Sequence, residues 1–189
     1  MKLFLISFRM LGFMTLLTGF IYPLLVTGIS QGLFSKEANG SLITKDGIVI
    51  GSSLIAQKFE SDRYFWARPS ATDYNPLPSG GSNLSPVSTA LKKNYDIRVE
   101  FLKQKHGTDS TAPQDLIFNS ASGLDPHISL ASANYQIGRV AKARGLDIIA
   151  VRNAIDELTE SPQLGILGET KINVLKLNLN LDTLQRLRN

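Results

Sequence analysis

Hydrophobic and polar residues are unevenly distributed along the chain, and the first feature is an uncharged run from Met10 to Ser35. About 26 helical residues at roughly 1.5 Å each extend about 39 Å, which exceeds a hydrocarbon core of about 30 Å. A cleaved signal peptide would have a shorter apolar core followed by a small-residue cleavage site. The pattern therefore predicts a retained transmembrane helix over residues 10–34, between a short segment 1–9 and a domain 35–189.

The charges that flank this run predict its orientation. Lys2 and Arg9 lie on the short side together with the amino terminus, whereas Lys36 is offset at once by Glu37. Basic residues favour the cytoplasmic side of a membrane helix. We therefore expect residues 1–9 in the cytoplasm and residues 35–189 outside the cytoplasmic membrane.

Small residues and a proline follow one face of the expected helix at about 100° per residue. Glycine lets helix backbones approach closely in lipid, and proline frees a carbonyl group that a neighbour has to satisfy. Glycine is also simply common in membrane helices, which is the alternative explanation. We expect a stripe that contacts partner helices, formed by Gly12, Thr15, Gly19 and Pro23, with Gly28 and Gly32 as a nearby G-x-x-x-G pair.

The remaining pattern predicts one mixed α+β domain, because helical and alternating periods both occur in it. The expected elements are a hairpin turning at Asp46–Gly47, a short helix over 53–59, a helix from Ser85 and Pro86 to Gly107, a strand over 114–118, helices beginning after Ser129 and Asp147, the first of them ending at Gly145, and a strand over 169–182. In the helix over 85–107, the apolar residues at helical spacing are Leu91, Tyr95, Val99 and Leu102; in the helix after Ser129, the residues expected to face inward are Tyr135, Ile137 and Val140.

A proline-rich loop, "FWARPSATDYNPLPSGGSNLSP" at residues 65–86, combines turn residues with aromatic ones. Prolines and glycines break helices and strands, whereas a flexible linker would lack the aromatic side chains. We expect an ordered loop that docks on a partner, because large amphipathic side chains carry most interface energy. The docking residues are expected to be Trp66, Arg68, Tyr74 and Asn75.

The second half of this loop contains Ser79, Gly80, Gly81 and Ser82. Exposed backbone donors in such a segment can cradle phosphate. A phosphate-binding loop would also need a lysine and a strand-to-helix context, which this segment lacks. It is therefore a weak nucleotide-binding candidate.

Composition removes several function classes. Without Lys2 and Arg9, 18 basic side chains stand against 16 acidic ones, so the domain lacks the basic surface of a nucleic-acid binder. The chain has no cysteine, and His106 and His127 have no metal-ligand spacing, so we expect no metal site. The two histidines are expected near a helix end and in a loop. The residues Arg139, Lys142 and Arg144 form either a basic edge or, as we favour, a solvated helix face.

Several segments together resemble the C subunit of the bacterial Kdp potassium-transporting P-type ATPase. They are "GFIYPLLVTGISQGLF", "ANGSLI", "GSSLIAQKF", "FWARPSA", "YNPLPSGGSNLSP", "SASGLDPHIS", "ANYQIGRVAKARGL" and "LGETKINVLKLNLNLD". The resemblance covers nearly the whole chain. It implies one membrane helix, an external domain, and three partners: a potassium-carrier subunit, an ATP-hydrolysing subunit and a small single-helix subunit.

The family is also described as a catalytic chaperone that raises the ATP affinity of the hydrolysing subunit. Ser79–Gly80–Gly81 is similar to part of the signature loop of ABC transporter ATPases, with Ser82 where that loop has glutamine. An external domain would be out of reach of cytoplasmic ATP, so ATP is implied by the resemblance alone. The alternatives are a free-standing membrane-anchored enzyme and an external ligand-binding module. The absence of a nucleophile–base pair disfavours the enzyme, and scattered acidic residues disfavour the binding module.

Overall fold

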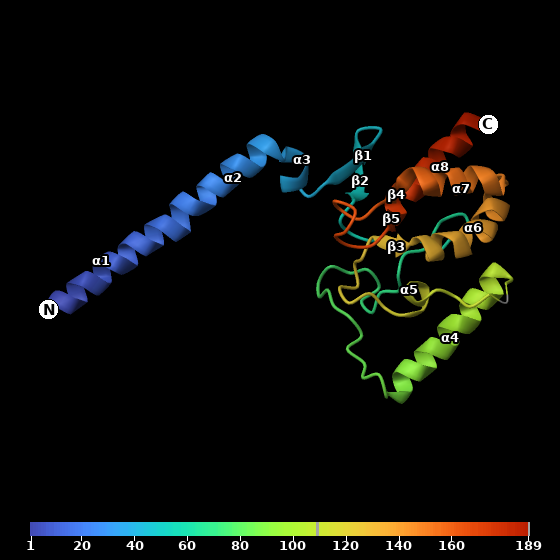
Figure 1. Cartoon of the computed structure of the whole chain (residues 1–189), viewed down its shortest axis with the longest axis horizontal. Coiled ribbons are helices and arrows are strands. Elements are labelled where there is room, and N and C mark those ends of the chain that lie inside the picture. The colour runs from blue at the N-terminus through green and yellow to red at the C-terminus, as the bar shows by residue number, and fades with distance from the viewer. Residues whose placement is uncertain (109, 189) are drawn as a thin grey trace. The chain divides into compact units, whose positions relative to one another are not determined.

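The computed structural model describes residues 1–108 and 110–188 and divides the chain into two compact units, Met1–Ile50 and Gly51–Asn189 (Figure 1). In chain order the elements are α1 (Lys2–Leu16), the π-helical turn η1 (Leu17–Ile21), α2 (Tyr22–Leu33), α3 (Ser35–Ala38), β1 (Leu42–Lys45), β2 (Ile48–Ser52), α4 (Thr89–His106), α5 (Gln114–Ile117), β3 (His127–Ser129), α6 (Leu130–Arg144), α7 (Ile148–Leu158), β4 (Thr159–Glu160), β5 (Lys171–Asn173) and α8 (Val174–Arg188). This is the α+β class that the sequence predicts.

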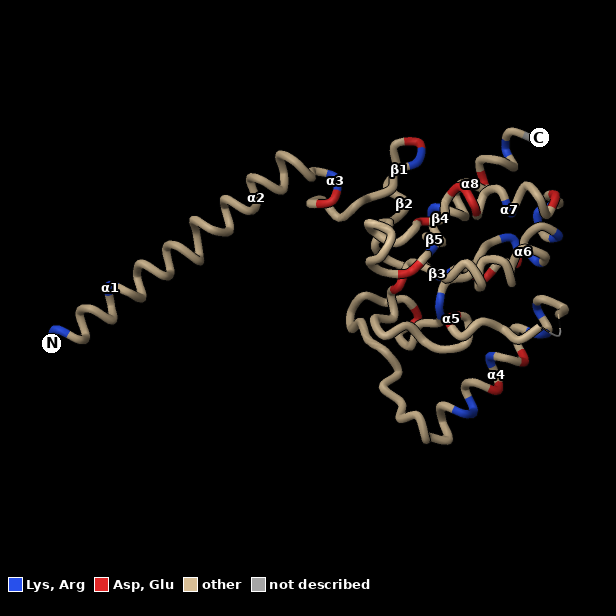
Figure 2. The backbone as a smooth tube through the Cα atoms, viewed as in Figure 1, with Lys and Arg blue, Asp and Glu red and all other residues tan. Residues whose placement is uncertain are grey.

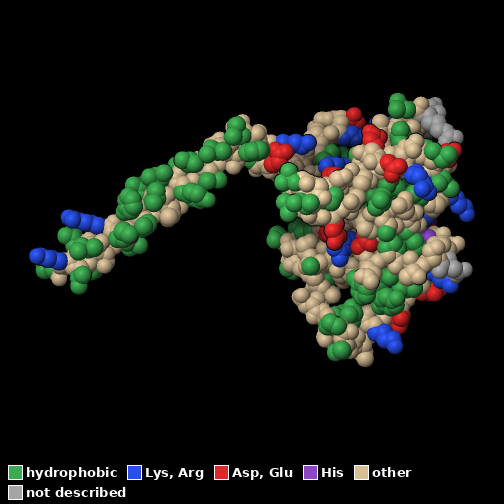
Figure 3. Space-filling view, in the orientation of Figure 1, with side chains coloured by type: hydrophobic (Ala, Val, Ile, Leu, Met, Phe, Trp, Pro, Cys, Tyr) green, Lys and Arg blue, Asp and Glu red, His purple; other side chains and the backbone are tan. Residues whose placement is uncertain are grey.

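The first unit is dominated by a helical run over Lys2–Leu33, which is long and apolar enough to cross a membrane. Its charged residues lie near the amino terminus, and hydrophobic side chains are spread along the rest of it (Figures 2 and 3). The predicted apolar helix is confirmed. It begins before the charge-free run, because Lys2 and Arg9 are themselves helical.

Pro23 accounts for the irregular middle of this run. Proline has no N–H group, and its ring clashes with the carbonyl four residues earlier, so the α-helical ladder is disturbed one turn before it. Here that turn is η1, in which Tyr22 N–H donates to the carbonyl of Leu17, five residues back. Because a π turn advances each residue by a smaller angle than an α turn, a stripe counted at a constant angle is not continuous across it.

The hairpin that follows has the turn that the sequence predicts. β1 and β2 form a two-stranded sheet, and the two residues between them, Asp46 and Gly47, have φ angles of +52° and +79°. Two consecutive residues with positive φ give the tight turn that favours Asp-Gly between short strands.

In the second unit, a three-stranded antiparallel sheet has the order β3-β5-β4. Ile172 at the centre of β5 pairs with Ile128 of β3 and with Thr159 of β4. Helices α6 and α7 follow from their caps: the side chain of Ser129 accepts from Ser132 N–H, and that of Asp147 accepts from Ile149 N–H. Both predicted helices are confirmed.

The predicted strand over 169–182 is wrong beyond β5, because Val174 begins α8. Alternating leucines suggested a period of two, but the fully buried residues Val174, Leu177, Asn178 and Leu181 recur at the spacing of a helix face. A buried asparagine on that face hid the helical period. Asn173 also caps the helix, because its side chain accepts from Lys176 N–H at 3.1 Å.

Two short predictions are also wrong. Residues 53–59 are not helical, because Ala56 N–H donates to the carbonyl of Leu124 and ties this segment to another loop. Residues 114–117 form α5 rather than part of a strand over 114–118. Leu116 and Ile117 are neighbours and both are buried, whereas a strand would place them on opposite faces.

Helix α4 begins later than predicted, at Thr89, although it ends as expected at Gly107 with a φ of +59°. Ser88 is the N-cap and accepts from Leu91 N–H, while Ser88 N–H donates to the carbonyl of Ser85 and closes a turn before the helix. Only Leu102 of this helix is fully buried. Much of α4 is therefore open to solvent.

The hydrophobic core has two clusters. The larger one joins the sheet to α6, α7 and α8 and includes Phe65, Ile128, Val140, Ile155, Ile172 and Leu177. The smaller one joins α4 and α5 to the proline-rich loop and includes Trp66, Leu102, Leu116 and Ile117. Adjacent residues of one segment, Phe65 and Trp66, thus belong to different clusters and hold them together.

Candidate functional site: the arginine network around Trp66

Two amide side chains hold the backbone of Phe65 and Trp66. Asn178 of α8 accepts from Phe65 N–H at 2.8 Å and donates to its carbonyl at 3.0 Å. Gln136 of α6 accepts from Trp66 N–H at 2.8 Å and donates to its carbonyl at 3.2 Å. Both amide side chains are buried, so these bonds satisfy backbone groups that water cannot reach.

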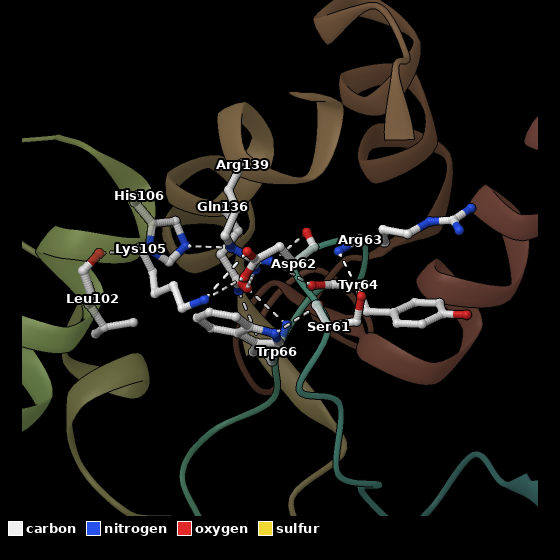
Figure 4. Close-up of polar contacts among 10 residues, drawn as sticks. All are labelled: Ser61, Asp62, Arg63, Tyr64, Trp66, Leu102, Lys105, His106, Gln136 and Arg139. Carbon is white, nitrogen blue, oxygen red and sulfur yellow. Dashed lines mark hydrogen bonds and ion pairs between the residues drawn. The ribbon is translucent and has the colours of Figure 1, made fainter. Parts of the chain in front are cut away.

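Arg139 of α6 covers the indole of Trp66, with its guanidinium carbon 3.7 Å from the ring centroid (Figure 4). Its terminal nitrogens donate to the carbonyls of Asp62 and Tyr64, at 2.6 and 3.0 Å, and to Gln136 Oε1 at 2.8 Å. Burial lowers the pKa of Arg139 to about 10, so it remains a cation near neutral pH. Backbone carbonyls therefore compensate this charge in place of a carboxylate.

His106, the last residue of α4, is held as a neutral ring. Its Nδ1 lies 2.9 Å from the carbonyl of Leu102, which can only accept, and its Nε2 lies 3.2 Å from Arg139 Nε, which can only donate. Nδ1 therefore carries the proton and Nε2 is the acceptor. Burial lowers the pKa of His106 to about 4, and the charge of Arg139 acts in the same direction.

A second buried arginine lies one turn further along α6. The Arg144 side chain is fully buried and pairs with Asp182 of α8 at 2.9 Å. It also donates to Gln185 of the same helix and to the carbonyl of Arg63. Arg139 and Arg144 are therefore structural, and the expectation of a solvated face is wrong for both; Lys142 between them is exposed.

We call the set Asp62, Trp66, His106, Gln136 and Arg139 the arginine network. Its one basic nitrogen suited to proton transfer, His106 Nε2, already accepts a hydrogen bond from a cation. Such a nitrogen cannot serve as a general base while that bond is present. The arrangement fixes segment 61–66 against α4 and α6 rather than activating a reactant.

The expected docking residues are distributed differently from the prediction. Trp66 is only 5% exposed, so it is a core residue and offers almost no surface to a partner, contrary to its expected role as an anchor. Arg68 is half-buried and pairs with Asp125 at 3.2 Å. Tyr74 is half-buried and donates from its hydroxyl to the carbonyl of Arg68. Asn75 is exposed, and its side chain accepts from Leu77 N–H.

The weak nucleotide-binding candidate has a packing role at one position. A Cβ on Gly81 would lie 3.1 Å from the carbonyl oxygen of Ala121, so glycine permits the loop to approach its neighbour closely. A Cβ on Gly80 would meet open space. Ser79 and Ser82 are exposed, and their hydroxyls make no hydrogen bond within the described residues.

The expected helix stripe is exposed within its own unit. No atom outside the local helix backbone approaches a Cβ built on Gly12, Gly28 or Gly32 within 4 Å, and the nearest such atom to Gly19 is Thr15 Cγ2 at 4.0 Å. Pro23 lies beyond the π turn. The role of this stripe in partner contact remains a prediction.

A groove runs along one side of α4, and we call it the α4 groove. It consists of two hollows of about 400 and about 390 Å³ that share Pro69, Arg98 and Phe101. The first extends past Trp66 and Tyr74 to the charged side chains of Lys58, Glu60, Asp73 and Lys105. The second is lined by Asn94, Ile97, Ile117 and Asn119.

The roles of Gln136, Asn178 and Arg139 were not predicted from the sequence. One signal was available: Gln136 stands between Ala133 and Val140 on the apolar face of α6. A polar residue on such a face is buried and has to be hydrogen-bonded, so it points to a polar network. Its partner Trp66, which lies 70 residues away, is not visible in the pattern.

Comparison with known proteins accounts for nearly the entire chain. The family described as "KdpC: K+-transporting ATPase, c chain" matches residues 4–183. Relatives named potassium-transporting ATPase KdpC subunit include one from Polaromonas naphthalenivorans, 52% identical over 91% of this chain and 90% of the relative. One from Geobacter sulfurreducens is 52% identical over 93% and 94%, and one from Methylococcus capsulatus is 51% identical over 90% and 92%. The chain therefore belongs to the KdpC family, the C subunits of potassium-transporting ATPases.

Proposed function

We propose that this chain is a non-catalytic accessory subunit of an ATP-driven potassium import complex. The observation that carries the proposal is the full-length similarity to potassium-transporting ATPase KdpC subunits. The proposed partners are a potassium-carrier subunit, an ATP-hydrolysing P-type subunit and a small single-helix subunit. The helical run Lys2–Leu33 would lie in the lipid of the inner (cytoplasmic) membrane, with residues 1–9 in the cytoplasm and the rest outside.

The non-catalytic role is supported by the way polar side chains are used. The arginine network uses His106 and Arg139 for internal hydrogen bonds, and Arg144 for an ion pair with Asp182. These groups stabilise the position of the segment that carries Trp66. A rigid external domain of this kind suits a subunit that acts through contact with its partners.

Copurification tests this function. The full chain, tagged at its carboxyl end and extracted in mild detergent, is expected to bring down a large P-type ATPase subunit and a multi-span carrier. Gly19→Leu should reduce their recovery, because it adds bulk on the expected stripe. Met14→Leu, at a position on the opposite face of the same helix, is the control. Recovery of the chain without any other protein would overturn the proposal.

We also propose that the chain affects ATP use through its partners and not by holding nucleotide in segment 79–82. The open space around Gly80 makes Gly80→Ala a clean probe, because it adds a methyl group without displacing a neighbour. In intact complexes, Gly80→Ala and Ser82→Ala should leave the ATP concentration for half-maximal hydrolysis unchanged. A selective increase with normal subunit recovery would show that this segment contacts nucleotide.

A further inference from the structure

Arg98 lies at the centre of the α4 groove, where the two hollows meet. Its Nε donates to the carbonyl of Leu116 at 2.9 Å, which fixes the direction of the side chain. Its guanidinium carbon lies 5.3 Å from the ring centroid of Phe101. The side chain is thus held in place by two contacts.

Within the described residues, Arg98 is less compensated than the other half-buried or buried arginines around it. Arg68 pairs with Asp125, Arg144 pairs with Asp182, and Arg139 has four acceptors. Arg98 has no carboxylate partner, and its two terminal nitrogens make no hydrogen bond among the residues that the structure describes.

This lack of compensation has a physical cost. A cation that is partly removed from water loses solvation unless acceptors replace the water. Burial accordingly lowers the pKa of Arg98, and only the partly buried Tyr74 opposes the shift. The lysines on the same groove differ, because Lys58 pairs with Glu60 and Asp73, and Lys105 pairs with Asp62.

The walls beside Arg98 are apolar and open. Ile97 is 59% exposed and Phe101 is 37% exposed, although both are large hydrophobic residues on a helix. Pro69 and Ile117 line the groove opposite them. Apolar walls around one unpaired cation suit an occupant that carries an acidic group between apolar groups.

We propose that the α4 groove receives a polypeptide segment of another subunit of the complex, in which an aspartate or glutamate flanked by apolar side chains pairs with Arg98. Charge complementarity selects the acidic residue, because Arg98 is the uncompensated cation of the groove. Two neighbouring hollows that share Pro69, Arg98 and Phe101 suit an extended chain better than a compact small molecule. This inference rests on the proposed function, because it requires a partner subunit.

The first test reverses the charge in the full chain. Arg98→Glu should lower the recovery of partner subunits about tenfold or more, since it places two carboxylates opposite each other. Lys92→Glu makes the same change of charge at an exposed position of α4 outside the groove and should leave recovery within about twofold. Arg98→Lys keeps the charge but loses the planar fork, and should give an intermediate value. Equal recovery with Arg98→Glu and Lys92→Glu would overturn the proposal.

The second test leaves Arg98 intact and uses the absence of native cysteine. A photoreactive maleimide is attached to Ile97→Cys or, as a control, to Ile149→Cys on α7, which has a similar exposure of 65%. Irradiation of the assembled complex should crosslink position 97 to a partner peptide that contains Asp or Glu. Position 149 should give no crosslink to that peptide.

The outcomes distinguish failure of the proposed function from failure of the groove assignment. If the wild-type chain recovers no other subunit, the proposed function fails. If the complex forms but position 97 crosslinks to no partner peptide, or to one without an acidic residue, the groove assignment fails alone. Sodium acetate titrated against the full chain in detergent tests for a free carboxylate. If acetate binds in a way that depends on Arg98, and position 97 gives no crosslink, the occupant of the groove is a small carboxylate ligand. That result would overturn the proposal of a polypeptide segment.

Discussion

At the scale of single residues, the backbone groups of Phe65 and Trp66 are all paired although neither residue lies in a helix or a strand. Asparagine and glutamine side chains each offer one acceptor and one donor group, so each can pair with the N–H and C=O of one residue. Asn178 and Gln136 do this from different helices. Removing either side-chain amide would leave two backbone groups unpaired, and these groups therefore determine how much stability is lost.

We expect Asn178→Ala to destabilise the chain by about 2–4 kcal/mol, because it leaves two buried backbone groups of Phe65 without partners. Asn180→Ala, on the same helix, should change the stability by less than about 0.5 kcal/mol. The Oδ1 atom of Asn180 is buried but has no hydrogen-bond partner among the residues that the structure describes, so the substitution breaks no hydrogen bond to this atom there. Denaturant unfolding of both variants in detergent measures the difference, and equal losses would contradict this role of Asn178.

His106 predicts a loss of stability in acid. Its pKa in the folded chain is lowered from the ordinary 6.5 to about 4, mainly by burial, so the folded state favours the neutral ring. The stabilisation is fully present above about pH 6.5 and is lost as the pH falls towards 4, because the unfolded chain binds the proton first. Protonation would also set Nε2–H against Arg139, which can only donate.

The measurement is the free energy of unfolding between pH 6.5 and 4. After discounting for partial exposure, the contribution of His106 is of order 1 kcal/mol. His106→Gln does not titrate in this range and should show a correspondingly smaller loss. Identical pH profiles for the two proteins would mean that His106 is not the group responsible.

At the scale of elements, α8 presents Leu177 and Asn178 inward at helical spacing although its leucines alternate along the sequence. In a strand, Leu177 and Leu179 would share one face and have similar burial. In the helix, Leu177 is fully buried and Leu179 only partly so. The assignment of this element therefore has a simple consequence for mutagenesis.

We expect Leu177→Ala to cost about 2–5 kcal/mol, as is usual for a fully buried leucine. Leu179→Ala should cost about 1 kcal/mol, because less of its surface is removed from water. Urea unfolding of the two variants under the same conditions gives the comparison. Similar losses would support a strand over residues 174–181 instead.

The elements differ in how far local chemistry determines them. Caps and turns are local, so Ser129, Asp147 and the Asp46–Gly47 turn could be located from the sequence. Segment 53–59 and α8 depend on partners distant in the chain. Ala56 pairs with the loop at Leu124, and Asn178 is buried because it binds Phe65. Such tertiary contacts override local periodicity.

The candidate site was predictable only in part for the same reason. The loop at residues 65–86 was expected to be ordered, and its Ser70 hydroxyl accepts from the backbone of Thr72 and Tyr74 in agreement with that expectation. Trp66 was expected on the surface because tryptophan is typical of interfaces. It is instead buried under Arg139, whose position depends on the packing of α6 against segment 61–66.

At the scale of the whole molecule, the proposed topology predicts which residues are reachable from outside the cell. A membrane-impermeant maleimide should label Ile149→Cys in intact spheroplasts, because the proposed location of Gly51–Asn189 is external and position 149 is exposed. The cysteine-free chain provides the unlabelled background. Labelling that appears only after lysis would place this unit in the cytoplasm.

The hydrogen bonds to Phe65 and Trp66 also have a consequence for the order of events on the ribosome. Phe65 is separated from Asn178 by 113 residues, and Trp66 from Gln136 by 70. During synthesis the N-terminal helix can enter the membrane early, but segment 65–66 has to wait until α8 has been synthesised. Until then the chain contains unpaired backbone groups and exposed aromatic rings. Nascent chains of this subunit are therefore vulnerable until α8 is complete, and a truncation before Val174 should be degraded rather than assembled.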